Sequence, residues 1–314
     1  MRILIPLLIL LASPSLLFAG QAGDESITVW LEKMRTALKE ESYEGVFTYM
    51  RGHRFDTVRV VHQFKDGVEV ERLVQLNGEQ REVLREGDEI ICRHEKTDHI
   101  DLEHDVPLGP FTHAFNENLS NYQAFYDFSL QGEDRIADHQ AIKLSISPRH
   151  DDRYGYRLWL DKDTGLLLQS HLVSRGRILE VFRFAQVDIG EPIEPANLAG
   201  NLDDFIEHNL TAMEPEAPEM VARPEWRVSW LPSGFRQITT RGPNRILFSD
   251  GIATISVFIE RSNNSQIDEA VTHMGGTVVL TRRLEGSAGQ ITVVGEVPVD
   301  TAKKVAASVE PVIY

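Results

Sequence analysis

Cysteine is almost absent from this chain: Cys92 is the single one among 314 residues. One thiol cannot form an intramolecular disulfide, so we expect no covalent crosslink within the fold. Cys92 lies in the apolar segment 89–94, a predicted strand, where a buried and unreactive thiol is expected. No cysteine lies at the end of the apolar N-terminal segment, so no lipid anchor is expected on a cysteine there.

Long apolar runs are also missing after the first 22 residues. Arg2 supplies one early positive charge, an apolar run extends to Phe18, and small residues follow at 19, 20 and 22. This order is typical of a secretory signal peptide rather than a spanning helix. We therefore expect residues 1–22 to be removed on export and a soluble mature chain to begin near Gly23.

Positive charge is scarce, because 32 basic residues face 48 acidic ones and the formal net charge is −16. The negative electrostatic potential of such a chain disfavours nucleic acid and anionic membrane surfaces as partners. An anionic ligand would need a local basic patch. The sequence offers two candidates, the cationic segment 51–59 and the pair Arg282 and Arg283, and either can equally be solvated surface.

Catalytic motifs are missing as well. The sequence has no Gly-x-Ser-x-Gly elbow, no glycine-rich phosphate loop and no activated Cys–His pair. His94 and His99 stand five residues apart, whereas a zinc-protease helix needs four. A metal hydrolase built on the loop of His99, Asp101, His104 and Asp105 stays open as an alternative, but the prediction is a non-enzyme without metal or cofactor.

The patterns that are present indicate a mostly β protein. Ser26 can cap a helix whose apolar residues Ile27, Trp30, Leu31, Met34 and Leu38 form one stripe. Alternating segments separated by turn signals then predict an antiparallel meander with a helix against one face. The predicted strands are 45–50, 57–65, 68–76, 81–84, 89–94, 141–147 and 178–187.

Residues 153–173 predict a β-hairpin with a turn at 161–165, in which Gly165 takes the left-handed conformation. This turn would place Leu160 opposite Leu166 and Leu158 opposite Leu168. Alternation then gives one apolar face and one mixed face. Either the apolar face packs on an ordinary core, or the sheet is curved around a lipid.

The second part of the chain is predicted to be a separate unit. Residues 191–224 are rich in proline and acids, which indicates a linker, with a short helix near 202–209. Residues 225–314 predict a small α+β sheet domain without a catalytic signature. Its predicted strands are 237–240, 245–249, 252–260, 277–282 and 290–296, and its predicted helices are 266–274 and 301–309, the latter capped by Asp300.

Several separated motifs resemble the RseB/MucB family over essentially the whole mature chain. They are the Trp30-Leu31-x-x-Met34 helix, the Tyr43-x-Gly45-x-Phe47-x-Tyr49 strand, the Gly78-x-x-Arg81-Glu82 stretch, the Tyr154 to Asp161 hairpin and the Trp230-Leu231-Pro232-x-Gly234-Phe235 segment. The resemblance implies an α+β, mostly β fold. Its large domain, residues 23–190, would be similar to the lipoprotein carriers LolA and LolB, with a curved antiparallel sheet as an unclosed barrel over helices.

The same resemblance implies a function. A family member would be a periplasmic negative regulator of an envelope-stress sigma-factor pathway that binds the periplasmic part of a membrane anti-sigma factor, shields it from site-one proteolysis, and is released by lipid or lipopolysaccharide. A periplasmic lipid or lipoprotein carrier remains the alternative, and a homo-oligomer is left open. The residues expected to bind lipid are Phe47, Tyr49, Leu158, Leu160, Leu168, Phe182 and Phe184. The residues expected to bind the partner are Trp230, Phe235 and Phe258.

Overall fold

The computed structural model describes residues 22–87, 89–95, 122–200, 205–209, 225–239, 244–260, 268–284 and 289–312. Residues 1–21 of the predicted signal peptide and the His99 loop lie outside these residues. Within the described part of the chain, no helix has the length and hydropathy that a bilayer crossing requires.

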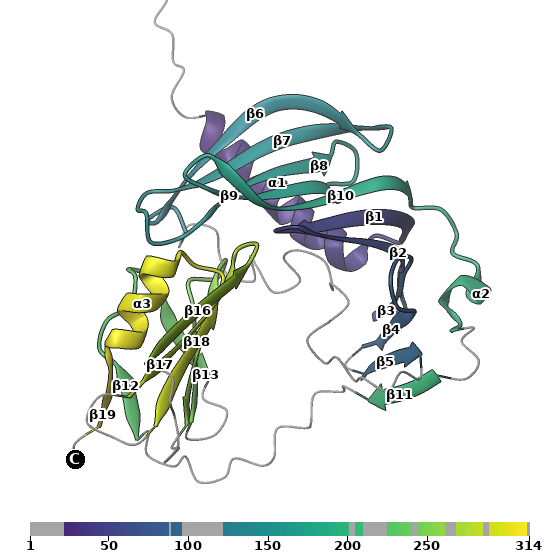
Figure 1. The fold of residues 1–314 in the computed structure, drawn as a ribbon. Helices are drawn as coiled ribbons and strands as arrows, with labels where there is room; N and C mark the ends of the chain where they lie inside the picture. Colours follow the sequence, from purple (N-terminus) through teal and green to yellow (C-terminus); the bar gives the residue numbers. More distant parts are fainter. Residues whose placement is uncertain are drawn as a thin grey trace, which may run out of the picture.

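An antiparallel sheet of eleven strands dominates the first part of the chain (Figure 1). Its spatial order is β11-β5-β4-β3-β2-β1-β10-β9-β8-β7-β6, so neighbours in sequence mostly pair and two edges remain unjoined. The strands are β1 (Tyr43–Arg51), β2 (Arg54–Lys65), β3 (Val68–Gln75), β4 (Arg81–Glu86), β5 (Glu89–Glu95), β6 (Tyr126–Ile136), β7 (His139–Pro148), β8 (Gly155–Asp161), β9 (Leu167–Ser174), β10 (Arg177–Ile189) and β11 (Phe205–Asn209).

The sheet curves over helix α1 (Ala22–Glu40), which contacts β2, β6 and β9 (Figure 1). The predicted apolar stripe is confirmed, because Ile27, Leu31 and Met34 are buried against the sheet. The helix begins at Ala22, so Ser26 lies inside it and the predicted cap is wrong. Together, α1 and the open, curved sheet confirm the fold class expected for the large domain.

The predicted hairpin exists, but its register differs from the prediction. Gly165 has a φ of 87° and its backbone N–H donates to Asp161, which confirms the turn. Leu160 faces Leu167 rather than Leu166, and Leu158 faces Ser170 rather than Leu168. A bulge between Trp159 and Leu160 shifts the register, because an extra residue on β9 lets Leu166, Leu167 and Leu168 all be buried.

Two segments of the large sheet were not predicted. Strand β6 was missed, because five of its central residues are polar or glycine and exposed, so it shows no clear alternation. The predicted helix near 202–209 is wrong, since β11 pairs with β5 there. A single-turn helix, α2 (Pro195–Leu198), precedes β11 and contacts β3.

The second part of the chain forms a six-stranded antiparallel sheet in the order β13-β14-β15-β18-β17-β16. Its strands are β13 (Arg236–Thr239), β14 (Arg245–Ser249), β15 (Thr254–Glu260), β16 (Glu269–Met274), β17 (Thr277–Arg283) and β18 (Gln290–Gly295). Helix α3 (Val299–Ala307) covers one face and contacts β17 and β18, while β12 (Trp226–Val228) pairs with β19 (Val309–Pro311). This arrangement confirms a smaller α+β sheet unit.

Two predictions for this part are wrong. The predicted helix 266–274 contains strand β16, an exposed edge strand held by β17 on one side only. Asp300 lies within the first turn of α3, whose N-cap is Pro298. At β16, pairing with β17 overrode a local pattern that favoured a helix.

Candidate functional site

The residues predicted to bind lipid gather on the face of the large sheet that is turned toward α1. Phe47 faces Phe184 across β1 and β10, and Tyr49 faces Phe182. The ring centroid of Phe47 lies 4.9 Å from that of Phe182 and 5.9 Å from that of Phe184. Leu158, Leu160 and Leu168 are fully buried in the same cluster. The residues predicted to bind lipid therefore lie together on one apolar face.

Helix α1 packs on this aromatic and leucine face. Leu31 and Met34 are fully buried in the same apolar cluster as the predicted lipid-binding residues. The Lys33 Nζ also donates to the carbonyl oxygens of Lys162 at 3.1 Å and Asp163 at 2.7 Å, which ties the middle of the helix to the β8–β9 turn. A hydrocarbon chain entering this cluster would have to displace α1 or its side chains.

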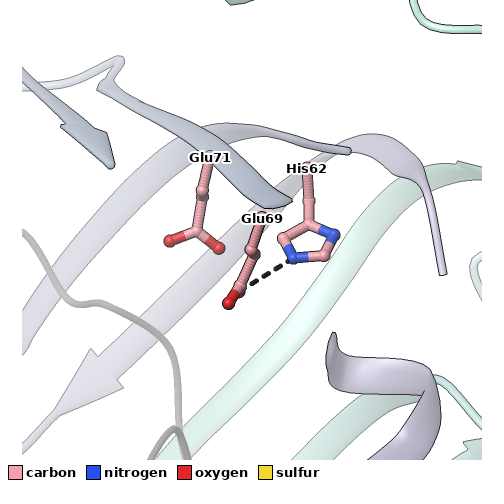
Figure 2. A group of neighbouring side chains, drawn as sticks. All are labelled: His62, Glu69 and Glu71. Atoms are coloured by element: carbon pink, nitrogen blue, oxygen red, sulfur yellow. Dashed lines mark hydrogen bonds and ion pairs between the residues drawn. The ribbon is translucent and has the colours of Figure 1, made fainter. Parts of the chain in front are cut away.

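A polar cluster fixes the end of α1 to the sheet (Figure 2). The fully buried His62 stacks on Tyr43, its Nδ1 lies 2.8 Å from the carbonyl oxygen of Glu41 just after α1, and its Nε2 lies 3.0 Å from the Glu69 carboxylate. Glu71 stands directly opposite His62 on β3 and completes a set of three groups that could hold a metal ion.

Arg85 already provides the positive charge for this cluster. Its guanidinium pairs with Glu69 and lies 3.6 Å from Glu71. Burial by itself would raise the pKa of Glu69, but the hydrogen bond from His62 and the charge of Arg85 hold that pKa below its usual value. Burial raises the pKa of Glu71. A guanidinium beside both carboxylates opposes a dication, so the cluster has a structural explanation as an anchor for α1.

The two sheets meet through a buried ion pair that sequence reasoning missed. Arg153, just before β8, and Asp250, in the β14–β15 turn, are both buried, with 2.7 Å between the Arg153 Nη1 and the Asp250 Oδ2. The Tyr126 hydroxyl donates to the same oxygen at 2.9 Å. The backbone amides of Ile252 and Ala253 donate to Oδ1. The charge is thus paired and its lone pairs are used, as burial requires.

A second contact joins strands β1 and β10 to the smaller sheet. The hydroxyl of Tyr49 donates to Glu180, whose other carboxylate oxygen accepts from the backbone N–H of Gly276 at 2.8 Å. Glu180, Phe182 and Phe184 are alternate residues of β10 and point to the same face of the sheet. A glutamate on this otherwise apolar face was the signal in the sequence that could have identified the contact. The Tyr49 side chain therefore touches both the apolar cluster and the contact region between the two sheets, which includes Arg153, Glu180, Asp250 and Gly276 and which we call the junction.

Glu296 follows β18 and adds a second carboxyl group to this junction. Burial first, and then the negative charge of Glu180, raise its pKa to about 7, while Arg51 opposes the shift. Two carboxyl groups in one poorly hydrated place cannot both ionise easily. The junction is thus sensitive to proton concentration near neutral pH.

The three residues predicted to bind a partner lie in different environments. Phe235 is buried, and the Arg153 guanidinium stands 5.4 Å from its ring centroid, so this residue belongs to the junction. Trp230 is 36% exposed beneath Lys304. Phe258 lies on the sheet face opposite the buried Val257 and Ile259, beside Arg245. Only Trp230 and Phe258 are accessible to another protein.

Comparison with known proteins gives matches over nearly the whole chain. The model of the MucB/RseB N-terminal domain matches residues 26–202, and the model of the MucB/RseB C-terminal domain matches residues 220–310. The sigma factor AlgU regulatory protein MucB of Pseudomonas aeruginosa is 35% identical over 97% of this chain and 96% of its own length. The sigma-E factor regulatory protein RseB of Salmonella typhimurium is 28% identical over 96% of each chain.

Solved structures agree with these matches. The complex of Pseudomonas aeruginosa MucA and MucB contains a chain that is 33% identical and superposes with a TM-score of 0.72, covering 92% of this chain and all of that one. A structure of MucB alone superposes with a TM-score of 0.65 at 31% identity, covering 92% and 98%. On these matches, which span both sheets and the segment between them, the chain belongs to the MucB/RseB family.

Proposed function

We propose that this protein is a periplasmic negative regulator of an envelope-stress sigma-factor pathway. It binds the periplasmic part of a membrane anti-sigma factor, shields that segment from site-one proteolysis, and releases it when lipid or lipopolysaccharide is bound. The observation that carries the proposal is the match to MucB over both sheets, because MucB has been solved in complex with MucA(peri). Its curated relatives are named regulatory proteins rather than enzymes.

The lipid site in this proposal is the apolar face beneath α1. An acyl chain of about a dozen methylenes offers on the order of 10 kcal/mol when each buried CH₂ contributes about 0.8 kcal/mol. Part of that energy is spent on moving α1, whose Leu31 and Met34 occupy the same apolar cluster. Lipid therefore favours an arrangement in which α1 has shifted away from the sheet.

Tyr49 connects that lipid site to the second sheet. Its ring belongs to the apolar cluster, while its hydroxyl orients Glu180, which accepts the backbone N–H of Gly276. A lipid that moves the Tyr49 ring removes the hydrogen bond that orients Glu180 and weakens the contact between the two sheets. Lipid binding can weaken this contact only if lipid binds more tightly to the arrangement with α1 shifted away than to the arrangement with α1 packed on the sheet.

The partner surface in this proposal is the sheet face of the smaller unit that α3 leaves uncovered (Figure 1). Phe258 lies on that face, and Trp230 lies near α3 at its exposed edge, with its backbone oxygen accepting from the Ser308 hydroxyl. Partly exposed aromatic residues are common anchors in protein interfaces. We assign Phe258 and Trp230 as anchors, whereas Phe235 serves the contact within the chain.

The function is tested with the mature chain and the periplasmic segment of the anti-sigma factor from the same genome. We expect a complex in calorimetry, slower cleavage of the segment by the site-one protease, and loss of both effects when lipopolysaccharide is added. The matched variants are Phe258→Ala, which should weaken the complex at least about tenfold, and Phe55→Ala, an exposed phenylalanine on β2 that should change nothing. A protein that transfers lipid but never binds the segment would be a carrier.

The coupling is tested separately with Tyr49→Phe, which keeps the ring and removes the hydroxyl. We expect lipid to bind this variant as before but to change its affinity for the segment less than in the natural chain. Tyr43→Phe is the control, because Tyr43 is buried on the same face of β1. Equal lipid effects in the natural chain and in Tyr49→Phe would refute the connection through Glu180.

A further inference from the structure

The outer face of strands β7 to β10, which is turned away from α1, carries a cluster of cations. Lys143 stands opposite Trp159, Arg157 stands opposite His171, and Arg183 stands opposite Gln169. Alternation places these side chains on the outer face, because Leu158 and Phe182 between them point into the core. Strands β7, β8 and β10 thus each place one permanent positive charge near Trp159 and His171, and we call this set the outer basic face.

Within the described part of the chain, the Asp134 carboxylate interacts electrostatically with Lys143 and Arg183. There, none of Lys143, Arg157 and Arg183 forms an ion pair, although the chain as a whole has a formal charge of −16. The Lys143 ammonium lies 5.1 Å from the centroid of the Trp159 ring. Asp134 stands at the rim, where its carboxylate accepts the indole N–H of Trp159 at 2.9 Å. Three cations against one carboxylate at the rim leave this face with a net positive charge, which attracts an anion.

His171 reports the potential at the centre of the outer basic face. Burial first, and then the charges of Arg157, Lys143 and Arg183, lower its pKa. Trp159 from β8 packs on the ring at 4.7 Å between centroids. The Nδ1 of His171 is buried and has no hydrogen-bond partner among the described residues. The side chains of three different strands therefore act at one point, where they disfavour the charged imidazole.

A polar groove continues from the outer basic face at the Arg157 end. Its volume is about 320 Å³, and its lining includes Ser145, Ser147, Arg157 and Arg175. Gly155 also lines the groove, and a Cβ there would stand 2.8 Å from the carbonyl oxygen of Ile146. One carboxylate, Asp151, lies 3.5 Å from Arg175. Hydroxyl and guanidinium donors around a small hollow form the donor set of an oxyanion site.

We propose that the outer basic face and its groove bind a soluble phosphate monoester. The groove is at the low end of the roughly 300–1,000 Å³ range of ligand pockets, so it suits a small molecule. Guanidinium forks and serine hydroxyls match the geometry of phosphate oxygens, and the unpaired cations match a dianion. The site lies on the opposite side of the sheet from the apolar cluster, so it goes beyond the regulatory function proposed above.

The experiment titrates the mature chain with glycerol 3-phosphate and with inorganic phosphate by calorimetry at low salt. We expect both to bind, the ester more tightly, and the His171 imidazole signal in NMR to shift and its pKa to rise as the dianion offsets the nearby charges. Variant Lys143→Gln/Arg157→Gln/Arg183→Gln should bind at least about tenfold more weakly. Thermal unfolding of each variant establishes that it is folded.

The matched control is Lys39→Gln/Lys65→Gln/Arg135→Gln, which removes the same charge from exposed positions on α1, β2 and β6. Equal weakening in both triple variants would show a general charge effect and overturn the site. Vesicles with phosphatidic acid carry the same phosphate on a membrane, and a Glu-rich peptide carries carboxylates. Binding of either one with no binding of glycerol 3-phosphate would also overturn the proposal, as would binding of no ligand.

Discussion

Protonation of Glu296 should strengthen the contact between the two sheets. In the joined arrangement the pKa of Glu296 is about 7, because burial and Glu180 disfavour its charged form, whereas a separated, hydrated glutamate titrates near 4.5. The folded contact thus binds the proton more tightly than the open form does. Its stabilisation is complete below about pH 4.5 and is lost as the pH rises through 7.

The magnitude follows from the difference between the two pKa values. A shift from 4.5 to about 7 corresponds to about 3 kcal/mol over the full range, at about 1.4 kcal/mol per pKa unit. When the pH falls from 8 to 5.5, the free energy that favours the joined form should rise by about 2 kcal/mol. Over this range Glu296 takes up a proton in the joined form, whereas the hydrated glutamate stays mostly ionised.

Urea unfolding followed by tryptophan fluorescence is the assay, since Trp226 and Trp230 lie in the smaller unit. When the pH falls from 8 to 5.5, the free energy of unfolding of the natural chain should rise by about 2 kcal/mol more than that of Glu296→Gln. Glu269→Gln, on the exposed edge strand β16, should follow the natural chain. If Glu296→Gln kept the full pH dependence, or if the natural chain were more stable at pH 8 relative to this variant, the reasoning would be refuted.

Three further changes test the packing of the fold. Asp250→Asn leaves the buried Arg153 guanidinium with Asp152 as its remaining counter-charge, so unfolding of the joined sheets should cost about 1–3 kcal/mol less, as measured in urea. Leu158→Ala removes a fully buried side chain, and a loss below about 2 kcal/mol in the same assay would contradict the core position. His62→Ala removes the contacts to Glu41 and Glu69, so hydrogen exchange should become faster at the end of α1, with a loss of about 1–3 kcal/mol.

The sequence by itself determined the local elements wherever one side of a strand or helix must be apolar. The stripe of Ile27, Leu31 and Met34 predicted α1, and the alternation around Phe47 and Phe182 predicted strands that proved to be neighbours. Such patterns are strong because the apolar period is 3.6 residues for a helix and two for a strand. The same patterns identified the residues of the apolar cluster.

Only the tertiary structure decided the features that depend on distant partners. The centre of edge strand β6 and the whole of edge strand β16 are exposed, so neither shows a strand alternation. Pairing with β7 and β17 determined their structure. The meeting of Arg153 with Asp250, 97 residues apart, has no local signal, and neither does the gathering of Lys143, Arg157 and Arg183 from three strands. The sequence does not show which charged side chains from distant strands share a face, because the sheet register decides this. The junction and the outer basic face could therefore be recognised only in the folded molecule.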